Sequence, residues 1–387
     1  MRLKNNFSPN TATAIVIANM IGTGVFTSLG YQLVDIDSGF VILLIWILGG
    51  VVAISGALCY AELGARLPRS GGEYNFLREI YHPAAGFISG WVSATVGFAA
   101  PTALAAITFG AYLSAVFPDL SDLSLLTSGG FAVSLIYVGY AYSGWNAATY
   151  LTGELENPRK TLPLILATGT GVVVLSYVMI NFVFLAVAPM GAMAGKLEVG
   201  YIAATYAFGD LGASLMGITL ALLLISTVSA MIVAAPKVLQ MLGQDFSVFR
   251  FLSRVNQHNI PSTAVYLQAG LTLLFLWTAS FESILVFSGA TMALNSLFAV
   301  IGVFIPRHRG ARSGEIEASV FRVPLFPLPP VIFITLTGLT LTYLAIERPV
   351  EILFSASVIV TGCLAYFATR HWNKRSMTDT NSRTTDV

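Results

Sequence analysis

An all-α polytopic membrane protein is the fold class that this sequence predicts, and three observations predict it. Of 387 residues, 56% are hydrophobic and 10% are charged, with a mean hydropathy of +0.77. Soluble domains carry about 25% charged residues. Apolar stretches of roughly 20 residues, the length that crosses a bilayer core, recur along the chain. Lys and Arg fall mainly in alternate connecting segments, as membrane topology requires.

Ten stretches are long and apolar enough to be spans. They are residues 11–32, 39–62, 84–117, 131–151, 163–188, 211–236, 262–280, 283–305, 324–346 and 350–370. Only a short turn with Glu282 separates the seventh from the eighth, so one long broken helix is the rival interpretation there. Residues 1–372 are expected to form a single transmembrane domain. Residues 373–387 have almost no apolar side chains and are expected to be a disordered cytoplasmic tail.

The distribution of basic residues predicts the topology. Eighteen of the 20 Lys and Arg residues lie in the N-terminus, the C-terminus and the segments after every second span. The alternate segments hold only Lys196 and Arg348. Because basic residues concentrate in cytoplasmic loops, both termini are placed on the cytoplasmic side of a plasma (inner) membrane.

Composition also excludes several functions. The net charge is +1, which gives no support for a nucleic-acid partner. Cys59 and Cys363 lie inside expected spans, where they are interpreted as small apolar residues. The four His residues fall in loops or at interfaces, so neither a metal cluster nor a catalytic pair is predicted. An enzyme and a cofactor are therefore not expected. Glu62 and Glu154 are interpreted as solvated partners in ion pairs with Arg66 or Arg159 that anchor loops, and a gating or proton-linked role is the alternative.

The first span is interrupted at membrane depth. Gly22, Thr23 and Gly24 follow Ile21 in an otherwise apolar run, and glycine costs about 1 kcal/mol in a helix relative to alanine. A second interruption, Tyr140 to Asn146, lies in the fourth span. Irregular backbone at this depth is tolerated where it lines a cavity enclosed by protein, and paired broken spans indicate the binding site of a transporter.

Broken helices offer free backbone groups to a ligand. The N–H end of a half-helix carries partial positive charge and suits a carboxylate, whereas the carbonyl end suits an ammonium. Here Gly22, Thr23 and Gly24 would donate to a carboxylate, and carbonyls near Ile21 and residues 140–143 would face an amino group. A zwitterion, which carries both a carboxylate and an ammonium, therefore fits the pair of broken helices. The alternative is that IleGlyThrGly is only a small-residue packing face between helices.

Several motifs in order resemble those of one family. IleGlyThrGlyValPhe at 21–26 resembles the first-helix motif of the amino acid-polyamine-organocation superfamily of permeases. TyrAlaTyrSerGlyTrpAsn at 140–146 resembles that family's sixth helix, and GlyGluLeuGluAsnProArgLys at 153–160 the loop after it. TyrAlaGluLeuGlyAlaArgLeuProArgSerGlyGlyGluTyr at 60–74 is similar to the loop after the second helix. AlaProLysValLeu at 235–239 and PheArgValPro at 321–324 match later elements.

The resemblance implies the leucine-transporter fold, two inverted repeats of five helices with substrate at the broken first and sixth helices. It implies an amino acid as substrate, moved by alternating access, and a short L-type-like branch. The substrate-binding residues it implies, together with the aromatic residues around them, are Ile21, Gly22, Thr23, Gly24, Tyr140, Tyr142, Ser143, Gly144, Trp145 and Asn146. Selectivity for the substrate side chain is expected to depend on Ser143, Asn146 and these aromatic residues.

One departure from the family concerns its fourth and fifth helices. Only residues 118–130 lie between the third expected span and the next, and 13 residues cannot contain a crossing. The first repeat would then be incomplete. Either lipid or a second chain of an oligomer closes the cavity, or the chain is a transport-impaired variant. The alternative function is therefore an amino acid-sensing or partner-binding membrane protein.

The coupling of transport stays open between proton symport, sodium symport and exchange. Ser226 and Thr227 in the sixth span are weak candidates for a sodium site beside the first interruption. Hydroxyls that bond back to carbonyls of their own helix are the alternative interpretation of these residues.

Overall fold

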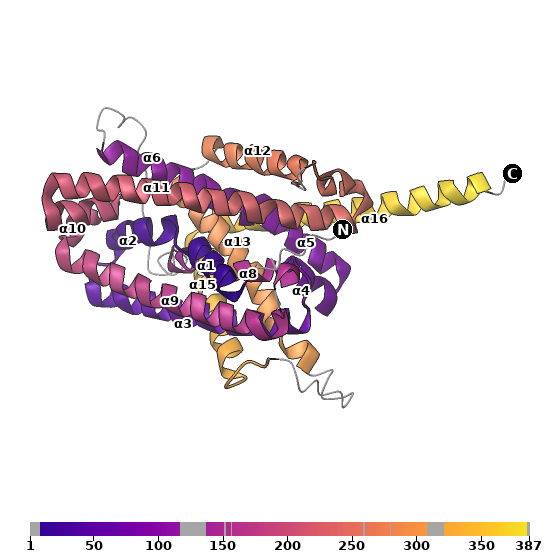
Figure 1. The fold of residues 1–387 in the computed structure, drawn as a ribbon, viewed down its shortest axis with the longest axis horizontal. Coiled ribbons are helices and arrows are strands. Elements are labelled where there is room, and N and C mark those ends of the chain that lie inside the picture. The colour runs from indigo at the N-terminus through magenta and orange to yellow at the C-terminus, as the bar shows by residue number, and fades with distance from the viewer. Residues whose placement is uncertain are drawn as a thin grey trace.

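The computed structural model describes residues 8–116, 137–150, 152–155, 157–257, 260–278, 280–307 and 321–384. They form a helical bundle (Figure 1). Eight described segments are long and apolar enough to cross a membrane: Pro9–Asp35, Gly39–Arg66, Pro83–Leu113, Pro158–Val187, Val199–Ser229, Phe281–Arg307, Leu328–Glu347 and Pro349–Thr369. The protein is an all-α, multi-pass membrane protein.

These eight segments correspond to eight of the ten expected spans. The expected span at 262–280 appears as an apolar helix, Ser262–Trp277, that is shorter than these eight segments. The expected span at 131–151 lies partly outside the described residues. The division near residue 280 is confirmed, because Ser280 caps a new helix by accepting a hydrogen bond from the Ser283 amide.

The N-terminal half consists of helices that the sequence breaks at Gly, Pro and polar residues. Their bounds are α1 (Pro9–Met20), α2 (Thr23–Asp35), α3 (Gly39–Arg66), α4 (Glu73–Ile80), α5 (Pro83–Val92), the π-helix η1 (Ser93–Gly97) and α6 (Ala99–Val116). Ser8 and Ser38 accept N-cap hydrogen bonds at the starts of α1 and α3, and Pro9 and Pro83 occupy first-turn positions where proline is favoured.

The C-terminal half carries the longer helices. Their bounds are α8 (Ala147–Tyr150), η3 (Thr152–Glu154), α9 (Pro158–Val187), α10 (Met190–Met193), α11 (Val199–Asp245), η4 (Ser247–Ser253), α12 (Ser262–Thr278), α13 (Phe281–Ile301), α15 (Leu328–Glu347) and α16 (Pro349–Thr384). Helix α11 is kinked at Gly209, whose φ is 68°, so the expected span at 211–236 begins just after this kink.

Helix α16 continues to Thr384 and therefore includes residues that the sequence predicts to be disordered. In Figure 1 its last part projects away from the bundle, towards the end marked C. The division into a transmembrane domain at 1–372 and a tail at 373–387 stays a prediction.

Helices α9 and α11 run along the same face of the molecule, and α1 lies between them (Figure 1). Helix α3 packs against α9 on one side and α15 on the other, and α13 packs against α15 and α16. Large side chains fill the space between these helices: Trp46, Tyr60, Tyr142 and Tyr177 are all at most 2% exposed. This packing holds the broken helix α1–α2 in the middle of the bundle.

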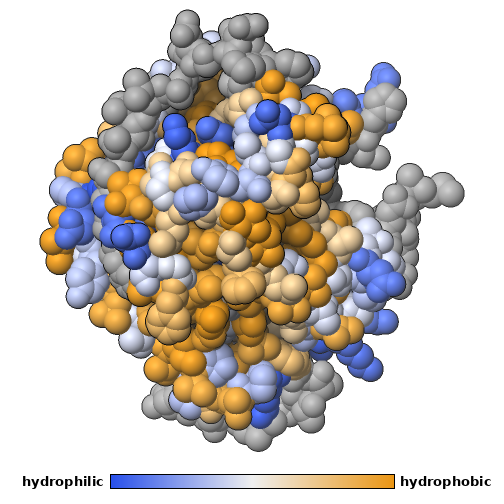
Figure 2. Space-filling model, turned by 90° about the vertical axis from the view of Figure 1, so that its left-hand side faces the viewer, coloured by the Kyte–Doolittle hydropathy of each residue, from blue (hydrophilic) through white to orange (hydrophobic). Residues whose placement is uncertain are grey.

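The outer surface is apolar where a bilayer would contact it. Exposed large hydrophobic residues cover the outer faces of the long helices, among them Leu175, Phe182, Leu215, Leu222, Tyr266, Trp277 and Leu339. Figure 2 shows the end of the molecule that carries α10, where hydrophilic residues gather in patches beside hydrophobic ones. An apolar flank with polar residues gathered near the helix ends is the pattern of a protein embedded in lipid.

Glu62, near the end of α3, is a buried carboxylate that joins three segments of the chain. It forms the predicted ion pair with Arg66, but the expectation that this pair is solvated is wrong: Glu62 is 1% exposed, because it also accepts hydrogen bonds from Arg307 and from the Val323 amide. The Val323 bond measures 2.8 Å. Arg307 lies just after α13, so this cluster fixes the ends of α3 and α13 and the start of the α15 region to one another.

Arg307→Leu is expected to destabilise the protein by about 3–5 kcal/mol, because it leaves the Glu62 charge buried without its main partner. Arg66→Leu should cost less, since Arg307 and the Val323 amide would remain. Thermal unfolding of both variants in detergent compares these losses. An equal loss from the two variants would contradict the account of this cluster.

Asp245 forms a second cluster at the same end of the bundle. Its carboxylate accepts hydrogen bonds from Arg69, at 3.0 Å, and from Tyr74 and Arg78. Burial alone would raise the pKa of this carboxyl, but the three hydrogen bonds outweigh burial and hold the pKa below its usual value. The cluster therefore joins the end of α11 to the segment around α4.

Because the pKa of Asp245 is lower in the folded protein, this cluster stabilises the fold fully above the unfolded pKa of about 3.9. The stabilisation is lost as pH falls from there through the folded pKa. We expect the stability difference between the natural chain and Asp245→Asn to shrink as pH is lowered from 6 to 3. Thermal unfolding of both at several pH values measures it, and a difference independent of pH would be contrary to the account.

A third ion pair marks the opposite end of α13. Arg348, between α15 and α16, contacts Glu282 in the first turn of α13 at 2.6 Å. Arg307 follows the other end of the same helix, so Arg307 and Arg348 lie at opposite ends of the bundle. This arrangement agrees with the predicted topology, in which the segments that hold Arg307 and Arg348 lie on opposite sides of the membrane.

Candidate functional site

The first predicted interruption is present. Helix α1 ends at Met20, and Ile21 and Gly22 are extended, with φ, ψ of −72°, 92° and −142°, −153°. Helix α2 then begins at Thr23 with no side-chain cap on its first amides. The first amides of a helix have no partner within that helix, so binding of an anion by residues 22–24 stays a prediction.

The second predicted interruption is also present. The chain is helical through Ala141, passes through turn residues 142–146, and resumes as α8 at Ala147. Gly144 has a φ of +94°, a conformation that side-chain-bearing residues rarely adopt. The Ser143 amide bonds to the Tyr140 carbonyl, and the Ala147 amide to the Gly144 carbonyl, each at 2.9 Å.

The two interruptions pack directly against each other. A Cβ atom added to Gly24 would lie 2.3 Å from the Ala141 Cα, and one added to Gly144 would lie 2.7 Å from the Asn19 carbonyl oxygen. Each break therefore supplies a glycine where the backbone of the other passes. The sequence predicts these glycines as breaks and ligand donors, and the structure adds close packing as a reason for them.

Hydroxyl groups surround the carbonyl end of α1. The Tyr177 hydroxyl on α9 donates to the Met20 carbonyl, and the Thr227 hydroxyl on α11 donates to the Ile21 carbonyl at 3.3 Å. Two neutral hydroxyl donors thus bind the carbonyls at the first break.

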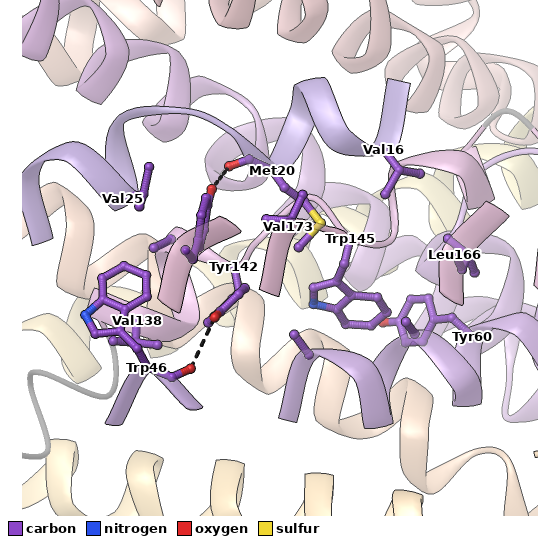
Figure 3. Close-up of a cluster of buried hydrophobic side chains, with 14 of the residues drawn as sticks. Val16, Met20, Val25, Trp46, Tyr60, Val138, Tyr142, Trp145, Leu166 and Val173 are labelled. Atoms are coloured by element: carbon purple, nitrogen blue, oxygen red, sulfur yellow. Dashed lines mark hydrogen bonds between the residues drawn. The ribbon is translucent and has the colours of Figure 1, made fainter. Parts of the chain in front are cut away.

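Aromatic rings enclose the second break. Figure 3 shows Tyr142 reaching Trp46, whose carbonyl accepts a hydrogen bond from the Tyr142 hydroxyl at 3.1 Å, and Trp145 pointing towards Tyr60. The Trp145 and Tyr60 ring centroids are 4.6 Å apart at 76°, an edge-to-face contact. Such pairs add about 0.5–1.5 kcal/mol beyond their buried area, so they hold the turn in one conformation.

A cavity of about 640 Å³ opens beside the second break. It lies between this break and helices α3, α13 and α15, and its wall is mostly apolar, with Ser143, Asn146, Ser296, Thr337 and Thr340 as hydroxyl and amide groups. Glu347 stands at the end of α15 that borders it. The volume is that of a small-molecule site.

The structure divides the predicted site residues into two groups. The cavity is lined by all six predicted residues of the second break: Tyr140, Tyr142, Ser143, Gly144, Trp145 and Asn146. Ile21, Gly22, Thr23 and Gly24 do not line it: Gly24 packs against Ala141, and Gly22 lies beside Thr227 on α11. Their role in binding stays a prediction.

Of the two sodium candidates, Thr227 donates to the Ile21 carbonyl and also to the Leu223 carbonyl of its own helix, at 3.5 Å, which is the contact that the alternative interpretation expects. A sodium site at these residues stays a prediction. The side chain of Ser226 lies outside the described residues. Across the described part of the chain, no group of three or more His, Cys, Asp and Glu side chains is placed to hold a metal ion.

Sequence reasoning missed Glu73. The interruptions themselves contain no charged residue, but the Glu73 carboxylate at the start of α4 contacts Asn146 and is 2% exposed. Glu73 follows Gly71 and Gly72, both at positive φ, so the tight turn that aims it inwards was a readable signal. The contributions of α13 and α15 to the cavity were also not foreseen.

A second missed contact lies at the other end of the broken span. Tyr137 donates a hydrogen bond to Glu282 at 3.0 Å, and Glu282 also pairs with Arg348. Tyr31 stacks on Phe281 with ring centroids 5.8 Å apart. These contacts connect the segment before the second break to the start of α13.

Two broken helices in contact at mid-bundle, an adjoining cavity and an apolar exterior define a secondary transporter, a class that is not enzymatic. The sequence model of the family described as amino acid permease matches residues 7–138 and 124–369. The chain therefore belongs to the amino acid permeases of the amino acid-polyamine-organocation superfamily, and it is an amino acid transporter.

Individual relatives agree with this assignment. The serine/threonine exchanger SteT of Bacillus subtilis is 25% identical over 86% of this chain and 89% of its own length. The cystine/glutamate transporter of Homo sapiens is 24% identical over 97% of this chain and 87% of its own. The large neutral amino acids transporter small subunit 2 of Homo sapiens is 24% identical, with 96% and 82% covered.

Two details of these matches concern segments that relatives have and this chain lacks. The two matched ranges meet and overlap at residues 124–138. The alignment to the cystine/glutamate transporter runs over 447 positions although this chain has 387 residues, so the relative has segments without a counterpart here.

Proposed function

We propose that this chain moves an amino acid across the plasma (inner) membrane by alternating access, with both termini cytoplasmic. The α-carboxylate binds the amides at residues 22–24, and the amino group faces carbonyls near Ile21 and residues 140–143. The observation that carries the proposal is the direct contact of the two helix breaks, at Gly24 with Ala141 and at Gly144 with Asn19. Tyr140, Tyr142, Ser143, Gly144, Trp145 and Asn146 surround the substrate side chain.

The fold we propose is the leucine-transporter fold with ten spans and an incomplete first repeat. The family's fourth and fifth helices are absent, which is supported by the two-part family match meeting at 124–138 and by the longer relatives. Residues 1–372 form the transporter domain, and 373–387 a cytoplasmic tail. Lipid or a second copy in an oligomer covers the face that the absent helices leave open.

Uptake of radiolabelled amino acids into proteoliposomes tests the proposal. We expect at least one of the twenty common amino acids to accumulate above empty liposomes. No uptake of any of them would refute transport by this chain.

The missing segment favours a second candidate, an amino acid-sensing or partner-binding membrane protein that retains the site. A thermal shift on adding amino acids, without uptake, would support this function over transport.

Coupling to a cation is tested in the same vesicles. A sodium ion would lie at the Ile21 carbonyl, whose oxygen is 3.3 Å from the Thr227 hydroxyl. Ser226 is the neighbouring candidate ligand. Replacing sodium by choline, and imposing a proton gradient, separates sodium symport, proton symport and exchange.

A further inference from the structure

Glu73 is the central acceptor of a buried hydrogen-bond network beside the cavity. Its carboxylate accepts hydrogen bonds from Tyr60 on α3, at 2.9 Å, and from Asn146 and Tyr150 of the broken span. It is 2% exposed, and none of the described Lys, Arg or His side chains forms an ion pair with it. Three neutral donors therefore hold this carboxylate.

A carboxylate can only accept hydrogen bonds, so its partners must donate. The side-chain amide of Asn146 has to turn its Nδ2 towards Glu73, and the same nitrogen also donates to the Tyr150 hydroxyl at 3.4 Å. Both amide hydrogens of Asn146 are then used. Its Oδ1 is the atom left for the cavity that Asn146 lines.

We infer that Glu73 is a specificity-determining positioning residue: it turns the Asn146 amide so that the cavity selects a substrate that donates a hydrogen bond to the Asn146 Oδ1. The inference rests on the proposed function, since it concerns the substrate of that site. The donor is either the α-ammonium or a hydroxyl or amide on the substrate side chain. Buried acceptors left without a donor penalise a substrate that lacks one.

The test compares two substitutions with opposite expectations. Glu73→Gln keeps the shape but adds a donor, so the Asn146 amide loses its fixed orientation. Glu73→Asp shortens the side chain but keeps a carboxylate. If Glu73 acted only as a structural residue, Gln would be tolerated better than Asp. If Glu73 instead fixes the orientation of the Asn146 amide, Glu73→Asp retains the selectivity of the natural chain and Glu73→Gln loses it.

Binding is measured by thermal shift with threonine and valine, which match in shape and differ by a hydroxyl. For a side-chain donor we expect the natural chain and Glu73→Asp to favour threonine by about fivefold, and Glu73→Gln to bring the ratio near one. For an ammonium donor, Glu73→Gln weakens both ligands by the same factor and Glu73→Asp does not. Unchanged affinities in Glu73→Gln, or a greater loss in Glu73→Asp, would overturn the inference.

A double variant keeps the test decisive if the single variant misfolds. Glu73→Gln combined with Asn146→Asp keeps one carboxylate and one amide in place, with the carboxylate now on the cavity side. It should restore the affinity or selectivity lost in Glu73→Gln, and failure to do so in a folded protein counts against the inference. Glu79→Gln on the same helix, with a side chain 48% exposed, is the matched control. Binding without uptake would refute transport while leaving this test intact.

Discussion

Gly24→Val is expected to reduce amino acid uptake about 10- to 100-fold. A Cβ at this position would lie 2.3 Å from the Ala141 Cα, which is backbone and cannot rotate away. The variant must push the two breaks apart, and overpacking of this kind costs about 1–3 kcal/mol. The same displacement would move the amides of residues 22–24 away from residues 142–146. Initial uptake rates in proteoliposomes, normalised to inserted protein, measure the effect.

The matched control is Gly171→Val on α9, where an added Cβ meets nothing within 4 Å. This control should transport at the rate of the natural chain. Uptake by Gly24→Val equal to that of the control would show that the contact between the breaks does not matter for transport.

Gly144→Ala is expected to lower both the stability of the protein and its amino acid uptake, for two reasons. Its φ of +94° is strained for any residue with a side chain, at a cost of about 1–3 kcal/mol, and the Cβ would meet the Asn19 carbonyl oxygen at 2.7 Å. We expect both a lower unfolding temperature and at least about tenfold weaker uptake. Thermal unfolding and uptake are measured on the same preparation.

Gly338→Ala on α15 serves as the comparison, because an added Cβ there has open space. It should match the natural chain in both measurements or be slightly more stable, as alanine favours helix. If Gly144→Ala behaved like Gly338→Ala, the turn at 142–146 would not be conformationally constrained.

Local sequence predicted the features that depend on nearby residues. Hydropathy located eight spans, and Gly22 and Gly144 marked two breaks within a residue or two of their observed positions. The Glu62–Arg66 ion pair followed from residues one helical turn apart. These predictions need only composition, glycine and helical spacing.

Contacts between distant segments were not predictable in this way. Arg307 approaches Glu62 from 245 positions away, and the wall that α13 and α15 contribute to the cavity depends on how helices pack. Glu73 belongs to a motif used only for its resemblance, and its burial against Asn146 required three segments to meet. Whether Ile21 to Gly24 line the cavity likewise depends on tertiary structure.

A structure of the chain with the amino acid that it transports would test the central claim most directly. We predict density for one amino acid between the breaks, with its carboxylate within hydrogen-bond distance of the amides of residues 22–24 and its side chain directed towards residues 142–146. An amino acid bound only in the cavity against α13 and α15, without contact to residues 21–24, would contradict the account.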